Sequence, residues 1–508
     1  MSIYLHYDVK GIQSFIFKIP KLKYIVGGSA LIDRFDKETM PNLEFSGAKH
    51  IFSGGGKGTF LCDSEVDAKK LKREIIKEAH SIGIDIRFGQ NESYSQAAQH
   101  ADELYSFIPK MHGGKPCPES GLYPIEEGEE IHPVIHARRY SRGDKVFRRF
   151  ENSLLLDGCG LIPGKSKDEL EFFHNVNSED GDGKNGAFSL GNRNRWAVIS
   201  MDGNDMGMQF RTQIKNNLNP EDMQAWIQEM SKTLDENTTR ATLAGIQRVV
   251  SEWAGSKKGK ESVIKEGTIT LPIRPLVVGG DDIVVLCHSS YAITFVKEVT
   301  RIFEKSSKKK SELWPATKGK LTISAGILYT SVTLPLHTAI PYSEALLGSA
   351  KTHGRKSVKD GEASPACIDW EQITDSVVDT PAAKRQRELI FFDEEINRTV
   401  KLTQRPYTME EFSFVEELAE KYGHDRKFKL PRTIRHKILP ALKKGYNERL
   451  AFSAEIKKNH SDLFQSICEY KGIDNIWETD KEKKEQSIKL IDALMLLEED
   501  SRMEKETV

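Results

Sequence analysis

The sequence predicts an α+β protein in which two similar halves are followed by a helical C-terminal region. Two glycine-rich hairpins, near residues 55 and 280, each lie between apolar runs and precede a helix and a further strand. After about residue 380 the apolar residues recur at helical spacing. A chain of 508 residues has room for about three domains of ordinary size. We therefore expect a first half at residues 1–108, a loop-rich insert at 109–190, a second half at 191–372 and a helical region at 373–508.

Composition argues against several broad classes of protein. The 74 Lys and Arg nearly balance 75 Asp and Glu, so the net charge of −1 does not favour nucleic-acid binding by bulk electrostatics. The six cysteines form no Cys-x-x-Cys pair, which fits a reducing cytoplasm rather than a disulfide framework. We find no signal-peptide pattern and no apolar run long enough to span a membrane. We therefore expect a cytoplasmic protein without a membrane partner.

The second hairpin carries the most informative motif, Gly-Gly-Asp-Asp at residues 279–282. Runs rich in β-branched residues flank it, and its glycines tolerate positive φ and let the backbone approach a bulky ligand. Two adjacent carboxylates at a hairpin tip are costly unless a cation neutralises them. Mg²⁺ that carries nucleotide phosphates would do so, because it is a hard cation with oxygen ligands. An ordinary solvated turn is the alternative interpretation.

The segments around this motif follow a definite order. A buried strand runs into Asp202 and a glycine turn, and a long helix follows at about 222–254. After the hairpin we expect a helix at 289–305, a strand at 321–327 and a helix at 342–351. That last helix ends in Ala-Lys-x-x-Gly-Arg, which brings Lys351 and Arg355 to its C-terminus.

This order resembles the palm domain shared by GGDEF-type nucleotide cyclases and the large polymerase-like subunit of type III CRISPR effector complexes. The resemblance implies two ferredoxin-like palm domains in tandem and a C-terminal α-helical bundle. In that fold, acids of the first strand and of the hairpin hold two metal ions against a triphosphate. The resemblance implies that the metal ligands here are Asp202, Asp281 and Asp282. Relatives often place another acid two residues after the first, but that position is Asn204 here, so Asp205 becomes the further candidate.

The same resemblance implies a set of nucleotide contacts, namely Gly203, Gly279, Gly280, Ser324, Lys351 and Arg355. The chemistry agrees, because phosphoryl transfer needs positioning and charge stabilisation, and two ions of Mg²⁺ or Mn²⁺ can clamp the attacking and leaving oxygens. Lys351 and Arg355 would offset the charge of a leaving pyrophosphate. Lys and Arg are also favoured at any helix C-terminus, because of the helix dipole.

Residues 1–108 look like a second, altered copy of the palm. A strand at 3–9 precedes a helix at 13–35 that we expect to be interrupted at Gly27-Gly28, and the hairpin carries Gly54, Gly55, Gly56 and Lys57. Lys57 occupies the place of a carboxylate, so we do not expect a metal site in this copy. The glycine turn and its lysine could cradle the phosphates of a second nucleotide, or could be no more than a tight turn.

The insert and the C-terminal region carry weaker signals. In the insert, His112, Cys117, His132 and His136 could form a mixed zinc site, although their spacing is atypical and surface histidines are the alternative. A basic cluster there could grip nucleic acid or be a solvated loop; it consists of Arg138, Arg139, Arg142, Lys145, Arg148 and Arg149. In the C-terminal region we expect helices that include 382–403 and 481–497. The resemblance implies that this bundle is a protein-contact surface.

The predicted function is a nucleotidyltransferase that converts ATP into cyclic oligoadenylate in CRISPR type III or related antiviral defence. ATP and the product are implied by the resemblance alone. The alternative is a scaffolding subunit that binds nucleotide and, through other type III subunits, guide RNA and target RNA. A diguanylate cyclase is less expected, because those enzymes pair single palms of two chains. The larger relatives begin with an HD nuclease domain, whereas this sequence starts at the first palm, so we expect no DNase activity.

Overall fold

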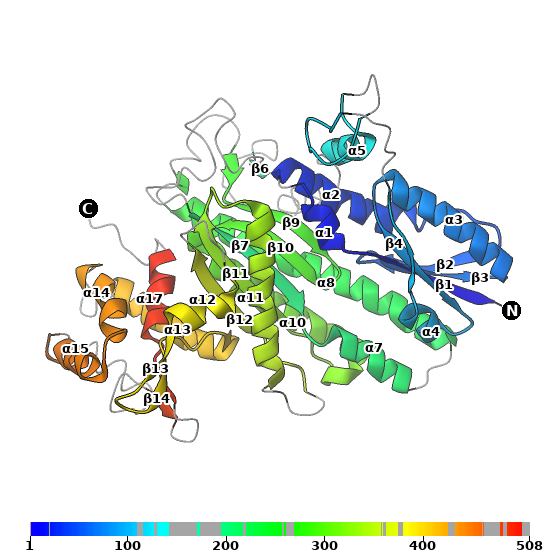
Figure 1. The fold of residues 1–508 in the computed structure, drawn as a ribbon. Helices are drawn as coiled ribbons and strands as arrows, with labels where there is room; N and C mark the ends of the chain where they lie inside the picture. The colour runs from blue at the N-terminus through cyan, green and yellow to red at the C-terminus, as the bar shows by residue number, and fades with distance from the viewer. Residues whose placement is uncertain are drawn as a thin grey trace.

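The computed structural model describes most of the chain (Figure 1). The described residues are 2–19, 21–108, 115–125, 130–141, 170–172, 195–216, 220–256, 259–260, 269–356, 358, 362–373, 379–424, 432–459, 461, 478–480 and 485–499. The N-terminal half and the C-terminal region lie at opposite ends of the molecule, with a six-stranded sheet between them (Figure 1).

The N-terminal half is built on a five-stranded sheet of order β2-β3-β1-β4-β5. Its central strand β1 pairs with β3 on one side and β4 on the other, which explains why five of its seven residues are buried. The strands are β1 (Ile3–Val9), β2 (Ala48–Gly54), β3 (Lys57–Cys62), β4 (Ile86–Asn91) and β5 (Glu103–Tyr105). The helical elements are α1 (Ile12–Phe17), α2 (Leu22–Arg34), the π-helix η1 (Phe35–Thr39), α3 (Glu65–Ser81) and α4 (Tyr94–Gln99).

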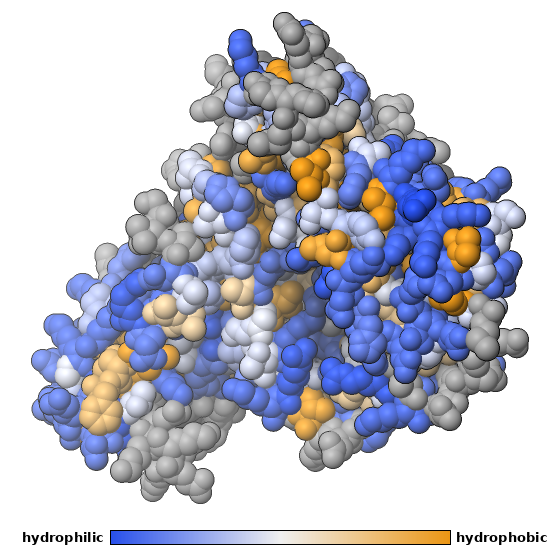
Figure 2. Space-filling model, turned by 45° about the vertical axis from the view of Figure 1, so that its right-hand side comes forward, coloured by the Kyte–Doolittle hydropathy of each residue, from blue (hydrophilic) through white to orange (hydrophobic). Residues whose placement is uncertain are grey.

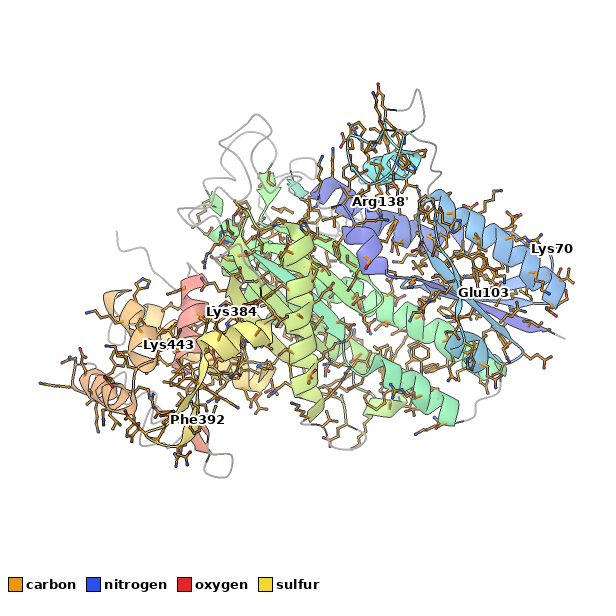
Figure 3. All side chains as sticks on the ribbon, viewed as in Figure 1. Lys70, Glu103, Arg138, Lys384, Phe392 and Lys443 are labelled. Atoms are coloured by element: carbon orange, nitrogen blue, oxygen red, sulfur yellow. The ribbon has the colours of Figure 1, made fainter. Side chains whose placement is uncertain are left out.

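The predicted interruption at Gly27-Gly28 is wrong. Both glycines lie inside α2, and the break falls earlier, between α1 and α2. A Cβ on Gly27 would lie 1.8 Å from the carbonyl oxygen of Arg138 in α5 (Pro133–Ser141). Arg138 is buried and its Nη2 donates to the carbonyl of Phe15 at 2.7 Å, next to the α1–α2 pair (Figure 3). The glycines therefore serve the close packing of α5 on α2.

The second half is built on a six-stranded sheet of order β15-β12-β11-β7-β10-β9. The strand β7 lies antiparallel between β10 and β11, so its polar end is enclosed from both sides. The strands are β7 (Arg195–Gly203), β9 (Ile273–Gly279), β10 (Asp282–His288), β11 (Ile323–Ser331), β12 (Cys367–Ile373) and β15 (Tyr407–Thr408). A separate two-stranded sheet pairs β6 (Leu170–Phe172) with β8 (Ile269–Leu271).

Three helices of this half follow the predicted order, namely α8 (Pro220–Gly255), α10 (Ala292–Ser307) and α11 (Leu336–Lys356). A further helix, α7 (Met206–Lys215), was not predicted. The helix α10 packs against α8, and α11 crosses β7, β11 and β12. The helix predicted at 342–351 is longer than expected at both ends. Short 3₁₀ turns η3 (Ser289–Tyr291), η4 (Lys308–Leu313) and η5 (Pro315–Thr317) complete this half.

In the C-terminal region the helix predicted at 382–403 is wrong. The structure has a short helix α12 (Pro381–Glu388) and then a hairpin of β13 (Ile390–Asp393) and β14 (Arg398–Lys401). Aromatic and β-branched residues favour the strands, and Asn397 takes φ of 50° at the turn. The helix predicted at 481–497 begins only at Leu490, because β17 (Glu485–Ser487) pairs with β14 in a sheet of order β13-β14-β17-β16. The remaining elements are α13 (Met409–His424), α14 (Arg432–Leu442), α15 (Tyr446–Asn459), β16 (Glu478–Asp480) and α17 (Leu490–Glu499).

A buried ionic network joins the C-terminal region to the second sheet. Arg385 of α12 binds Asp369 of β12 through two nitrogens, at 2.6 and 3.0 Å, and also reaches Glu371 at 3.1 Å. Arg405 lies 3.5 Å from Glu371 and 3.0 Å from Asp492 of α17, with all three side chains fully buried. Since each buried charge has an opposite partner, the two regions are held together by more than apolar packing.

Tandem sheet-containing halves followed by a largely helical region confirm the predicted fold class. None of the described helices is long and apolar enough to cross a membrane. Figure 2 shows a face on which hydrophilic residues dominate and hydrophobic residues lie in small separate groups.

Candidate active site

The two glycine hairpins have equivalent geometry. In the first, Gly54 pairs with Lys57 across a turn of two residues, and in the second Gly279 pairs with Asp282 in the same way. Next to each hairpin runs the first strand of its half. Asp8 of β1 pairs with Lys57, and the pair Met201–Ile283 brings the following Asp202 opposite Asp282. The register therefore equates Asp8 with Asp202 and Lys57 with Asp282.

Three carboxylates meet at the second hairpin. Asp202 lies near the end of β7, Asp281 lies in the turn and Asp282 opens β10. A Cβ on Gly203 would come within 2.9 Å of the Cβ of Asp281. The glycine thus allows the turn to fold down over the end of β7, and this contact brings Asp281 beside Asp202.

The pKa values of two of these carboxyls are raised, because the groups are desolvated beside a third carboxylate. Burial first, and then the charge of Asp202, raise the pKa of Asp281 well above its usual range. Asp282 has part of its surface in solvent, yet desolvation of its carboxyl and the charge of Asp202 raise its pKa to about 7. Both carboxyls would return to their ordinary acidity if a cation were bound among them.

Lys351 supplies the nearest positive charge. Its Nζ forms an ion pair with the Asp202 carboxylate and donates to the carbonyl of Gly203 at 2.8 Å. The helix α11 is held over β7 by a further hydrogen bond, since the hydroxyls of Ser343 and Ser200 are 2.7 Å apart. Arg355 lies about one turn after Lys351 and is exposed. The structure thus places Lys351 at the carboxylates and leaves Arg355 accessible at the helix end.

The donor atoms at this site suit a divalent cation, although their positions do not already form a coordination sphere. Within the described part of the chain, no three His, Cys, Asp or Glu side chains are arranged to hold a metal ion. Carboxylate oxygens are nevertheless the ligands that Mg²⁺ and Mn²⁺ prefer. The raised pKa values of Asp281 and Asp282 agree with three carboxylates crowded together beside a single lysine, Lys351. The donor set that fits a metal is therefore Asp202, Asp281 and Asp282.

Two predicted site residues have structural contacts of their own. Asp205 accepts hydrogen bonds from Ser364, at 2.7 Å from its amide and 2.8 Å from its hydroxyl. Ser324 is fully buried, and its hydroxyl lies within hydrogen-bonding distance of both Asn204 and the amide of Cys367. Asp205 and Ser324 thus hold the loop at 362–366 and β12 against the end of β7. Their predicted parts in metal and nucleotide binding stay predictions.

Two residues near the site were missed. Glu344 of α11 has a buried Oε1 without a hydrogen-bond partner, and burial together with the charge of Asp282 raises its pKa to about 7. Thr238 of α8 donates from its hydroxyl to the carbonyl of Gly280 at 2.6 Å. Glu344 precedes Lys351 by about two helical turns, so the sequence could have placed both residues on the same helix face near the site. For Thr238 the sequence holds no signal.

The first hairpin is fixed from beneath. Gly55 and Gly56 take φ of 62° and 73°. The amide of Gly56 donates to Oδ2 of Asp36, a buried residue of η1, at 2.6 Å. Asp8 forms an ion pair with Arg87 of β4, and Lys57 is exposed. The turn therefore presents Gly55 and Lys57 outward, while Gly56 is buried.

Each hairpin has one glycine that neither packing nor a positive φ explains. A Cβ on Gly54 or on Gly279 would meet no atom within 4 Å, and neither residue has positive φ. Neither packing within the chain nor backbone conformation accounts for glycine at these two equivalent positions. Close approach of a molecule from outside the chain would account for both.

The described part of the insert has no zinc-like arrangement. Burial works to raise the pKa of Cys117, but the amides of His132 and its other neighbours lower it overall. The ring of His132 stacks on Tyr123 with centroids 4.9 Å apart, and His136 lies against Tyr140. His112 lies outside the described residues, as do Arg142, Lys145, Arg148 and Arg149 of the basic cluster. Arg138 is buried and cannot contribute to a surface patch.

Comparison with known proteins agrees with this fold. Residues 195–359 match the family described as Cas10/Cmr2, second palm domain. The structure is similar to a Csm1–Csm4 cassette in complex with cA4, with a TM-score of 0.54 and 13% identity over 98% of this chain and 70% of that chain. It is similar to the cassette in complex with cA3, with a TM-score of 0.53 and 14% identity over 98% and 69%. It is also similar to Csm1 of T. onnurineus, with a TM-score of 0.51 and 14% identity over 98% of this chain and 69% of that chain.

No curated protein matches the sequence. The fold and the acidic hairpin define a protein of the palm-domain class. Within that class, the predicted likeness to the large subunit of type III CRISPR effector complexes is confirmed, in sequence for the second palm and in fold for nearly the whole chain. The predicted domain boundaries stay predictions.

Proposed function

We propose that this protein is a nucleotidyltransferase that joins ATP molecules into cyclic oligoadenylate. The observation that supports this most is the second hairpin, where Asp281 and Asp282 meet Asp202 beside Lys351. The solved structures of Csm1–Csm4 that share the fold are described as complexes with cA4 and cA3. ATP as the substrate, and other type III subunits as partners, come to this chain through that likeness.

In the proposed reaction each glycine hairpin receives one nucleotide. The open space above Gly279 and Gly54 admits the two triphosphates, and Lys57 lies beside the first. The 3′-hydroxyl of one nucleotide attacks the α-phosphorus of the other and passes its proton to a phosphate oxygen of the substrate, the bond to the β-phosphate oxygen breaks and pyrophosphate leaves. Repetition and a final intramolecular attack close the ring. Each step breaks one phosphoanhydride bond and forms one phosphodiester bond.

The protein's own part is positioning and charge. Asp202, Asp281 and Asp282 would hold Mg²⁺ or Mn²⁺, which when bound supplies charge neutralisation for the phosphates. Lys351, within reach of Asp202, and the exposed Arg355 would meet the leaving pyrophosphate. Such positioning can supply most of the rate enhancement, because phosphoryl transfer needs little covalent help from the protein.

The test is incubation of the purified chain with Mg²⁺ or Mn²⁺ and each labelled nucleoside triphosphate, with products resolved by mass spectrometry. We expect cyclic products from ATP that disappear in Asp281→Ala/Asp282→Ala. The matched control is Asp8→Asn, the equivalent first-strand position in the other half, which we expect to keep the products. Products that persist in the double variant would show that the acidic hairpin is not the site.

A scaffolding role is the second candidate, and it is favoured by the description of the similar structures as Csm1–Csm4 cassettes. Absence of product from the wild type, together with stable association with other type III subunits and RNA, would support it. Addition of a target-bound guide complex to the reaction separates a scaffold from an enzyme that needs an activator.

A further inference from the structure

The long helix α8 contacts both glycine hairpins. Thr238 of this helix donates to the carbonyl of Gly280 in the second hairpin at 2.6 Å. One turn earlier, Asp235 accepts a hydrogen bond from Nζ of Lys37 in the first half at 3.2 Å.

At the second hairpin the contact falls on the turn that carries a proposed metal ligand. Thr238 is fully buried, so its hydroxyl cannot exchange the Gly280 carbonyl for water. Gly280 has φ of 59° and open space around it, which leaves its peptide few other restraints. The hydrogen bond therefore orients the peptide that leads into Asp281.

At the first hairpin the contact passes through the π-helix η1. Lys37 binds Asp33 of α2 at 2.8 Å as well as Asp235. The neighbouring Asp36 accepts from the amide of Gly56 at 2.6 Å. Consecutive residues of η1 thus hold the first glycine turn on one side and α8 on the other, an arrangement that fits the frequent use of π-helical turns at functional sites.

A second contact strengthens this end. Gln228 of α8 donates from Nε2 to the carbonyl of Ile51 in β2, the strand that leads into the first glycine turn. Asp235 and Thr238 are three residues apart, so they lie on adjacent positions of one helix face. The path from Gly56 to Gly280 therefore consists of three hydrogen bonds, the backbone link from Asp36 to Lys37 and one turn of α8.

We infer that Lys37, Asp235 and Thr238 are positioning residues that fix the two glycine turns at one separation and orientation. The inference rests on the proposed function for its consequence, because an in-line attack between two bound nucleotides needs reacting atoms about 3–3.5 Å apart. The coupling itself is a property of the protein without nucleotide. A series of contacts does not by itself establish coupling, so the test measures it directly.

The experiment is hydrogen exchange of the full chain without nucleotide, followed by mass spectrometry of peptides that cover residues 48–62 and 273–288. We expect Lys37→Met, in the first half, to speed exchange in the second hairpin by about 2–5-fold, the range of one solvent-accessible ion pair. We expect Thr238→Val to speed exchange in both hairpins by about 2–10-fold, the range of one neutral hydrogen bond. Thr238→Ser, which keeps the hydroxyl, should restore the wild-type rates.

Two control variants lie on, or contact, the same helix. The hydroxyl of Thr242 bonds only within α8, to the carbonyl of Thr238 at 2.8 Å, so Thr242→Val tests loss of a helix hydroxyl. Lys310 forms an ion pair with Glu229 of α8 without reaching either hairpin, so Lys310→Met tests loss of an ion pair. We expect neither to change exchange at the hairpins. A Lys37→Met variant whose effect stays within the first half would overturn the inference.

Activity provides the second readout. We expect Lys37→Met and Thr238→Val to lower kcat for ATP with little change in KM, and the double variant to lose no more than the worse single variant. Additive losses, or losses in KM alone, would contradict a shared positioning role. If the wild type forms no product even when a target-bound guide complex is added, the proposed function fails, while the exchange experiment still decides whether α8 couples the two turns.

Discussion

Glycines in and beside the two hairpins look alike in the sequence, but the structure requires some of them and not others. Gly56 needs its positive φ of 73°, and a Cβ there would come within 2.2 Å of the Ile12 side chain. Gly203 needs the space that Asp281 fills. Gly279 has neither requirement. A residue that the fold does not require is the best place to separate binding from stability.

We expect Gly279→Ala to leave the unfolding free energy within about 0.5 kcal/mol of the wild type, because the new methyl group meets no neighbour. Its KM for ATP should rise, because the methyl group takes the space proposed for the triphosphate. Gly56→Ala should instead lower the unfolding free energy by about 1–3 kcal/mol, through backbone strain and the Ile12 contact. Urea unfolding and steady-state kinetics measure the two effects. An unchanged KM in Gly279→Ala would count against nucleotide binding at this hairpin.

The buried Asp36 makes stability depend on pH. Burial raises the pKa of Asp36 to about 7 from 3.8, so the folded protein binds this proton more tightly than the unfolded chain. Stability from this group is therefore present below about pH 4 and is lost as pH rises to about 7. We expect the unfolding free energy of Asp36→Asn to exceed that of the wild type by roughly 2–4 kcal/mol at pH 8 and to equal it near pH 4. The exposed Asp63→Asn is the control, and an equal gain at both pH values would refute the explanation.

At the scale of elements, the contact between α2 and α5 depends on a missing side chain. Because the Cβ of a residue at position 27 would lie 1.8 Å from the Arg138 carbonyl, Gly27→Ala must displace α5. We expect it to lower the unfolding free energy of the N-terminal half by about 1–3 kcal/mol, the usual range for overpacking. Gly348→Ala in α11 is the matched change, since its Cβ meets nothing and should stabilise the helix by about 0.5–1 kcal/mol. Thermal unfolding of both variants compares them; equal effects would show that packing is not the cause.

At the scale of the molecule, the buried network decides how firmly the C-terminal region is joined to the second palm. Arg385→Met would leave Asp369 and Glu371 buried with less positive charge, so we expect a loss of about 3–5 kcal/mol in the unfolding free energy. Arg387 lies on the same helix and its ion pairs are at the surface, so Arg387→Met should cost less than about 1 kcal/mol. Denaturant unfolding distinguishes them, and similar losses would mean that the network does not join the two regions.

Local pattern was enough to predict much of the fold. Helices α8 and α10 and the hairpin of β9 and β10 were predicted because apolar spacing and turn residues act within a short stretch of chain. The hairpin of β13 and β14 was missed because its strands have only four residues each, too few for the spacing of apolar residues to distinguish a strand from a helix. The pairing that fixes β17 comes from β14, far earlier in the sequence.

The sequence by itself determined the acidic hairpin, the strand that ends at Asp202 and the basic end of α11, because these depend on residue type and short spacing. Only the tertiary structure decided that Lys351, 149 residues from Asp202, forms an ion pair with it. Likewise, only the structure showed that Thr238 restrains Gly280 and that Asp36 restrains Gly56. The physical reason is the same in each case: these contacts form between distant segments, and their geometry follows from sheet register and helix packing rather than from local preference.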